Sequence, residues 1–144
     1  QHLKYKAELI ETAKQIVRPG YGILAADEST GTMGNRLSKI NVENTEPNRR
    51  FYRQMLFQTP GMENHISGVI MFEETLDQAT DDGVNFCELL KSKNVLPGIK
   101  VDKGLVVIGG TKNENATQGL DGLAEAHREC HDLLVEHRQH PGQP

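Results

Sequence analysis

Charged side chains end each of three short apolar runs in this 144-residue sequence. Asp27 closes the first run, Glu73 and Glu74 close the second, and the third carries Lys100 and Asp102 near its end. Carboxylates and a lysine gathered at one site can transfer protons to and from a polar substrate. A lysine among carboxylates keeps its positive charge and can hold a phosphate or an oxyanion. The pattern therefore favours an enzyme that acts on a small polar or phosphorylated molecule.

A purely structural explanation of the same pattern stays open, because a strand that leaves the core exposes charge at its end in any case. The repetition over three successive runs favours the functional explanation. In an open α/β sheet or a (β/α)8 barrel, the carboxyl ends of the strands line the active site. The pattern alone does not name the reaction.

The elements that must position these residues are strands that alternate with helices. Apolar runs predict strands over residues 22–26, 66–72 and 97–104, with 105–108 as an extension of the third strand or a strand of its own. Helical spacing and Pro or Gly stops predict helices over 3–17, 32–40, 45–57 and 86–92, and from 121 to about 139. Thr45 is the expected N-cap of the third helix. The alternation predicts parallel pairing through crossover helices, and hence an α/β fold.

Composition and charge exclude several classes of function. Hydrophobic residues make up 36% and charged residues 25% of the chain, which is typical of one globular domain. The net charge is −4, so we expect no nucleic-acid partner and no membrane partner. Apolar runs reach only about five residues, against roughly 20 in a transmembrane helix.

The two cysteines, Cys87 and Cys130, are too few for a disulfide framework. We interpret them as reduced thiols of a cytoplasmic protein. A disulfide and a catalytic thiol are the alternatives.

Five stretches of the sequence are similar to a known enzyme family. They read GILAADESTGTMGNRL, VENTEPNRRFYRQMLF, GVIMFEETL, GIKVDKG and TQGLDGL. In this order and at this spacing they closely resemble the N-terminal part of class I fructose-bisphosphate aldolases. The resemblance covers residues 1 to about 125.

The resemblance implies a (β/α)8 barrel that usually assembles as a homotetramer. It implies reversible cleavage of a phosphorylated sugar, fructose 1,6-bisphosphate, to dihydroxyacetone phosphate and glyceraldehyde 3-phosphate in glycolysis. The family uses no metal or other cofactor. A lysine forms a Schiff base with the ketone carbon, and the protonated imine accepts the electrons of the broken carbon–carbon bond.

Two residues are catalytic by this resemblance. Asp27 matches the family aspartate at the end of the first strand, which contacts substrate hydroxyls and helps proton handling. Lys100 matches the lysine of the third strand, which lies close to that aspartate in the family barrel. Glu74 matches a glutamate beside the pocket, for which we expect a structural role.

Four residues are substrate-binding by the same resemblance. Ser29 and Thr32 lie in the loop that lines the pocket, and Thr32 keeps the hydroxyl where many members have serine. Arg36 matches an arginine that binds a substrate phosphate, for which a planar guanidinium is suited. Arg49 matches a basic residue associated with substrate binding, with a solvated helix face as the alternative. Asn35 stands where many members have lysine, which could weaken phosphate binding.

The sequence accounts for only part of such a barrel. A complete one takes about 250 residues, whereas roughly three strands are present here. We therefore expect residues 1–125 to form the N-terminal part of an incomplete barrel and residues 126–144 a divergent tail, helical and then disordered. In the family the acid–base glutamate and the Schiff-base lysine lie on later strands, so we expect this chain alone to be inactive.

Two other functions are considered. The chain could be a non-catalytic truncated partner that associates with full-length aldolase or another protein. It could also be an unrelated phosphate-handling α/β domain, which fits the charged strand ends but not the five stretches. The oligomeric state of this chain is left open.

The tail after about residue 125 does not resemble the family. It holds four histidines and a cysteine, namely His127, Cys130, His131, His137 and His140. Two of the histidines are four residues apart and could share a metal on a helix, although zinc sites need three or four ligands. A solvated helix that frays at its end is one alternative. We favour another, that the tail arises from intron read-through, a frame error or an alternative exon.

Overall fold

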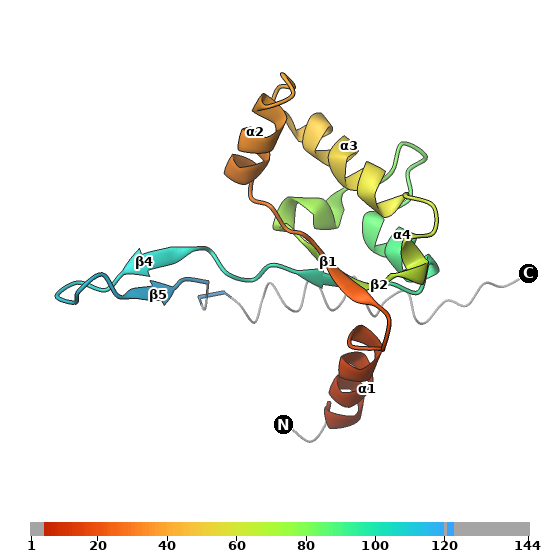
Figure 1. Cartoon of the computed structure of the whole chain (residues 1–144), viewed down its shortest axis with the longest axis horizontal. Coiled ribbons are helices and arrows are strands. Elements are labelled where there is room, and N and C mark those ends of the chain that lie inside the picture. The colour runs from red at the N-terminus through yellow and green to blue at the C-terminus, as the bar shows by residue number, and fades with distance from the viewer. Residues whose placement is uncertain (1–4, 120, 123–144) are drawn as a thin grey trace, which may run out of the picture. The chain divides into compact units, whose positions relative to one another are not determined.

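The computed structural model of the chain describes residues 5–119 and 121–122 (Figure 1). It divides the chain into two compact units, residues 1–99 and residues 100–144, which are treated separately below. The first unit holds, in order, α1 (Lys6–Ile16), β1 (Gly22–Ala26), α2 (Thr30–Ser38), α3 (Glu46–Phe57), the short 3-10 helix η1 (Met62–Asn64), β2 (Ile66–Met71), the 3-10 helix η2 (Glu73–Asp77), α4 (Phe86–Ser92) and β3 (Leu96–Ile99). The second holds β4 (Leu105–Val107) and β5 (Asn115–Thr117).

The three strands of the first unit form one parallel sheet in the order β1-β2-β3. Ala26 lies opposite Met71, and Met71 lies opposite Ile99, so the carboxyl ends of all three strands are level. The α/β prediction with parallel pairing is confirmed. The described strands form an open sheet and not a closed barrel.

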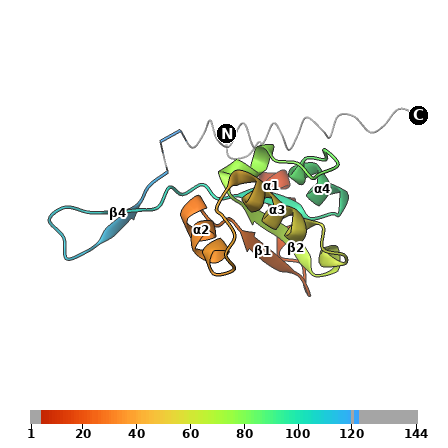
Figure 2. The same ribbon diagram turned by 90° about the horizontal axis from the view of Figure 1, so that it is seen from above.

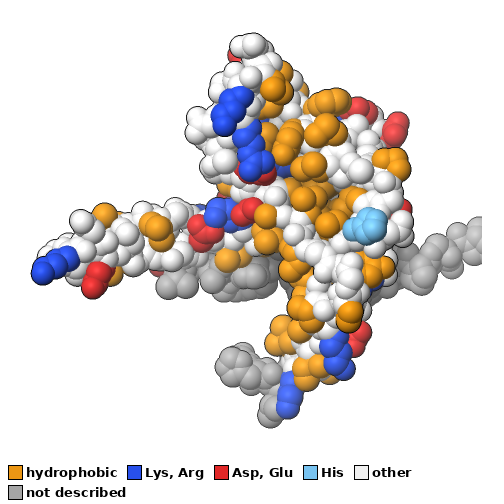
Figure 3. Space-filling view, viewed as in Figure 1, with side chains coloured by type: hydrophobic (Ala, Val, Ile, Leu, Met, Phe, Trp, Pro, Cys, Tyr) orange, Lys and Arg blue, Asp and Glu red, His pale blue; other side chains and the backbone are white. Residues whose placement is uncertain are grey.

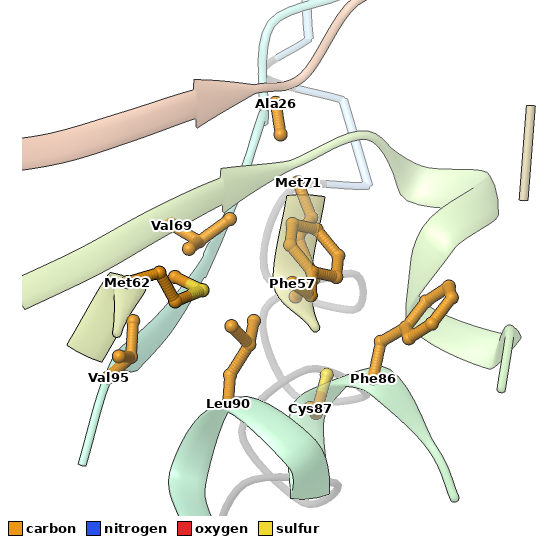
Figure 4. Packing of buried hydrophobic residues seen from close by; sticks show 9 residues of the cluster. All are labelled: Ala26, Phe57, Met62, Val69, Met71, Phe86, Cys87, Leu90 and Val95. Carbon is orange, nitrogen blue, oxygen red and sulfur yellow. The ribbon is translucent and has the colours of Figure 1, made fainter. Parts of the chain in front are cut away.

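The core lies between the sheet and the helices α3 and α4 (Figure 4). Apolar side chains from β1, β2, α3 and α4 meet there, and Phe57 packs edge-on against Phe86 with ring centroids 5.3 Å apart. Helix α1 packs on the sheet at a different place, where the Ser67 hydroxyl donates a hydrogen bond to the Ile16 carbonyl over 2.6 Å. Figure 2 shows α2 beyond the carboxyl end of β1. The core therefore fixes the position of α3 against the sheet and of the end of β1, from which the chain continues into α2.

Local signals placed most of the elements. Thr45 caps α3 as predicted, since its side chain accepts a hydrogen bond from the Asn48 amide. The predicted helix over 32–40 begins two residues earlier, at Thr30, because the Ser29 side chain accepts a hydrogen bond from the Thr32 amide and so caps the helix there. The helix predicted from residue 121 and the tail of residues 126–144 lie outside the described residues, apart from 121–122 in a turn.

The predicted third strand over 97–104 is wrong beyond Ile99. Strand β2 ends at Met71, the partner of Ile99, so β3 has no neighbour to pair with farther along. The chain then turns: the Asp102 carboxylate accepts a hydrogen bond from the Gly104 amide, and Gly104 has a φ of 91°, which favours glycine. The 105–108 run forms β4 as a strand of its own, paired antiparallel with β5 in the second unit.

The predicted boundary at residue 125 differs from the limit between the two compact units and stays a prediction. In the part of the chain that the structure describes, no helix combines the length and the apolar character needed to cross a bilayer.

Candidate functional site

Polar side chains gather at the carboxyl end of β1 in the first unit. We call them the strand-end cluster, which consists of Asp27, Glu28, Ser29, Thr32, Arg36, Arg49, Arg53 and Glu74. The cluster comes from the segment after β1, from α2, from α3 and from η2. Basic side chains are visible over α2 in Figure 3. Four elements are therefore needed to build this one edge of the sheet.

The two predicted pocket hydroxyls lie side by side. The Oγ atom of Ser29 and the Oγ1 atom of Thr32 are 3.1 Å apart, and Ser29 also accepts a hydrogen bond from the Thr32 amide over 3.3 Å. These contacts close the first turn of α2. They fix the shape of the segment directly after Asp27.

Arg36 reaches back from α2 to the end of β1. It forms an ion pair with the Glu28 carboxylate and donates a hydrogen bond to the Tyr52 hydroxyl over 3.2 Å. Its side chain is 52% exposed, whereas that of Glu28 is 8% exposed. An incoming anion can therefore reach the guanidinium while Glu28 stays behind it, an arrangement that suits phosphate binding.

Arg53 lies beneath the same strand end and is 2% exposed. It donates hydrogen bonds to two backbone carbonyls, from Nε to Ala26 over 2.9 Å and from Nη2 to Glu28 over 2.9 Å. Its Nη2 atom also lies 3.3 Å from Oε2 of Glu28. Burial lowers the pKa of the Arg53 guanidinium, and the Glu28 carboxylate acts in the opposite direction.

Arg49 is held by protein groups in a different way. Its guanidinium makes a two-pronged contact with Glu74, with Nε 2.8 Å from Oε2 and Nη2 bonded to Oε1. It also donates to the Asn44 side-chain oxygen over 3.1 Å. The Arg49 side chain is 11% exposed, so the alternative of a solvated helix face does not hold. Substrate binding by Arg49 stays a prediction, and the contact supports the structural role expected for Glu74.

The ion pair of Arg49 and Glu74 predicts a pH-dependent stability. The hydrogen bond from Arg49 lowers the pKa of Glu74 below its usual value. Glu74 therefore stabilises the folded state at pH values above the ordinary glutamate pKa of about 4.3, and this contribution is lost as the pH falls through the lower value of the folded state. We expect Glu74→Gln to destabilise the protein at neutral pH, with a difference from the unsubstituted protein that shrinks toward pH 3.

Acid titration followed by circular dichroism would check this expectation. Glu73→Gln is the matched control, because Glu73 is the exposed neighbour of Glu74 in η2. Equal losses for the two variants, or a loss that grows as the pH falls, would contradict the role given to the pair.

The two predicted catalytic residues belong to different units. Asp27 is half-buried directly after β1, and its carboxylate has no hydrogen-bond or ion-pair partner among the described residues. Lys100 begins the second unit, where it forms an ion pair with Asp102 and so lowers the pKa of that carboxyl. The predicted approach of Lys100 to Asp27 stays a prediction.

Sequence reasoning missed three members of this site and its surroundings, namely Glu28, Tyr52 and Arg53. A signal for Arg53 was available, since it follows Arg49 by four residues and so lies on the same face of α3. Glu28 follows Asp27 directly, but adjacency alone did not show that its carbonyl would accept a hydrogen bond from Arg53 and that its carboxylate would pair with Arg36 and Arg53.

Metal and thiol chemistry find no support in the described residues. No group of three or more His, Cys, Asp or Glu side chains among them could hold a metal ion. The four tail histidines and Cys130 lie outside the described residues. Cys87 is buried in the core at the start of α4, as expected of a structural thiol.

Comparison with known proteins gives a consistent family assignment. The family model described as "Glycolytic: Fructose-bisphosphate aldolase class-I" matches residues 8–133. Cytosolic fructose-bisphosphate aldolase 7 of Arabidopsis thaliana is 62% identical over 120 residues, which are 83% of this chain and 34% of that protein. The muscle-type aldolase of Lethenteron camtschaticum is 59% identical over 121 residues, 83% of this chain and 33% of that protein.

A solved structure shows the same similarity in three dimensions. Fructose-bisphosphate aldolase from Plasmodium falciparum, in complex with TRAP and a small-molecule inhibitor, matches with a TM-score of 0.87 at 52% identity. The match covers 90% of this chain and 38% of that chain. This chain thus spans about a third of the length of the curated relatives it matches.

Proposed function

Since the chain belongs to the class I fructose-bisphosphate aldolase family, we propose that it supplies the first strand-end residues of a fructose-bisphosphate aldolase. The reaction is the reversible cleavage of fructose 1,6-bisphosphate to dihydroxyacetone phosphate and glyceraldehyde 3-phosphate in glycolysis. The match of the family model to residues 8–133 carries this proposal. The likeness to a solved aldolase also confirms the fold prediction, an α/β unit of (β/α)8-barrel type whose described strands leave the barrel open.

The strand-end cluster gives the proposal its residues. Asp27 contacts the substrate hydroxyls and handles protons, and this role is supported by its carboxylate, which has no partner among the residues that the structure describes. Arg36 binds a substrate phosphate through its exposed guanidinium, which is supported by the position of Glu28 behind it. Ser29 and Thr32 line the pocket beside them. Lys100, which is catalytic by the family resemblance, takes part in the same reaction in this proposal.

Location and assembly follow from the same family. The similar proteins of Arabidopsis thaliana and Spinacia oleracea are named cytosolic and cytoplasmic, and we propose the cytoplasm for this protein. We also propose a homotetramer for the full enzyme, in line with the family resemblance.

The Schiff-base lysine of the family belongs to a later strand than those of this sequence. We therefore expect the 144-residue chain alone to show no aldolase turnover. Incubation with fructose 1,6-bisphosphate and borohydride, followed by intact-mass measurement, should leave its mass unchanged, whereas a full-length class I aldolase should gain the mass of a reduced adduct. A borohydride-stable adduct on the isolated chain would contradict this expectation.

A chimeric enzyme tests the proposed function directly. Residues 8–119 of this chain would replace the matching segment of Arabidopsis thaliana aldolase 7, which supplies the rest of the barrel. If the strand-end cluster is that of an aldolase, the chimera should cleave fructose 1,6-bisphosphate at a rate within about tenfold of the parent, since the two chains are 62% identical over 120 residues. A chimera that folds as the parent does but shows no cleavage would count against the proposal.

A further inference from the structure

We propose that Arg53 is the positioning residue for Asp27, and that it holds the end of β1 through the two carbonyls on either side of that aspartate. The inference rests on the proposed function, because it assigns Arg53 a role in the reaction of Asp27. Arg53 itself is buried under the strand end and is not placed to touch a substrate.

The geometry singles out one residue. Arg53 donates to the carbonyl of Ala26 and to the carbonyl of Glu28, each over 2.9 Å, and the residue between these two is Asp27. The donors are Nε and Nη2 of one planar guanidinium, so their separation and direction are fixed. The peptide group that leads into Asp27 and the peptide group that follows Glu28 are therefore tied to one rigid group, and Asp27 lies between them.

The burial of Arg53 argues for a precise contact. An arginine that is 2% exposed loses its hydration, and this loss is compensated only by well-placed partners. Its partners are the two carbonyls and Oε2 of Glu28 at 3.3 Å, a carboxylate that also pairs with Arg36. A well-packed apolar side chain at position 53 could support the fold equally well, but it could not bind the strand end.

Arg50 shows what the same residue type does elsewhere on α3. It donates to the Ala79 carbonyl over 2.9 Å and forms an ion pair with Asp81 over 2.6 Å. Its contacts fix the loop before α4, far along the chain from the segment that follows β1. Arg50 is therefore the matched control for an arginine that binds a backbone carbonyl and a carboxylate without touching the strand end.

The experiment uses the chimeric enzyme with Arg53→Lys, Arg53→Met and Arg50→Met. A lysine keeps the charge but offers a single nitrogen, which cannot reproduce two fixed donors. We expect Arg53→Lys to lower kcat about tenfold and Arg53→Met to lower it further, with KM changed less than threefold, because misplacement of a reacting group by about 1 Å can cost up to a hundredfold. Arg50→Met should leave kcat within about twofold.

A double-mutant comparison with Asp27 distinguishes a role of Arg53 in positioning that residue from a role in supporting the fold in general. In an Asp27→Asn background, Arg53→Lys should cost less than about twofold in the residual kcat, because the residue that it positions has lost its function. Equal effects of Arg53→Lys in both backgrounds, or an unchanged kcat in folded Arg53→Lys, would overturn the inference. If Arg53→Met fails to fold, the kcat of Arg53→Lys alone tests the positioning role. An unsubstituted chimera without turnover would overturn the proposed function, and this inference with it.

Discussion

Replacement of Asp27 by Asn is expected to lower the kcat of the chimeric aldolase by about a hundredfold or more, since a positioned acid–base group typically contributes 10²–10⁴-fold. Asn keeps the size of the side chain and its ability to hydrogen-bond, but it removes the negative charge and the proton acceptor. The fold should be little affected, because the Asp27 carboxylate has no partner among the described residues. The loss should appear in kcat more than in KM.

Steady-state kinetics of fructose 1,6-bisphosphate cleavage would measure the effect. Asp82→Asn serves as the control, because Asp82 is an exposed turn residue away from the strand ends. We expect its kcat to stay within about twofold of the unsubstituted chimera. An Asp27→Asn enzyme with a similarly unchanged kcat would remove Asp27 from the catalytic residues.

The largest expected effect on stability comes from Phe57→Ala. Phe57 is completely buried at the end of α3, and its ring packs against Phe86 in the core cluster. Truncation of a buried phenylalanine to alanine typically costs about 3–5 kcal/mol, from lost burial and from the cavity that remains. Since the same core supports the sheet edge and α3, we expect the free energy of unfolding to fall by about this amount.

The exposed phenylalanine of the same helix provides a close control. Phe51 is 60% exposed, so Phe51→Ala should change the free energy of unfolding by no more than about 0.5 kcal/mol. Thermal unfolding of the two chimeric variants, followed by circular dichroism, would compare them. Similar midpoints for both variants would show that the core cluster does not support this part of the enzyme as described.

Elements bounded by strong local signals could be predicted from the sequence. The strand over 22–26 and the helix over 86–92 have the predicted bounds, because apolar runs and helical spacing end there at polar or turn residues. The third strand could not be placed in the same way. Its end at Ile99 is set by the end of its partner β2, which lies about 30 residues earlier in the chain and leaves no mark on the local pattern.

The residues of the candidate site also differ in how far they could be predicted from local sequence. Ser29, Thr32 and Arg36 follow Asp27 within nine residues, so their place near the strand end follows from local order. The spacing puts Arg53 on the same face of α3 as Arg49, but its partners could not be predicted, because its hydrogen bonds reach backbone carbonyls 25 and 27 residues away. A sequence pattern gives side-chain types, and it does not show which buried charge will bind which peptide group.

The most direct test of the account is a crystal structure of the chimera after borohydride trapping with fructose 1,6-bisphosphate. We predict that the Asp27 carboxylate lies within hydrogen-bond distance of a sugar hydroxyl, about 2.6–3.2 Å. The Arg36 guanidinium should contact a phosphate, with Arg53 still bonded to the carbonyls of Ala26 and Glu28. A trapped sugar that leaves Asp27 without a contact, with Arg36 paired only to Glu28, would contradict the assignment of this strand end as the substrate site.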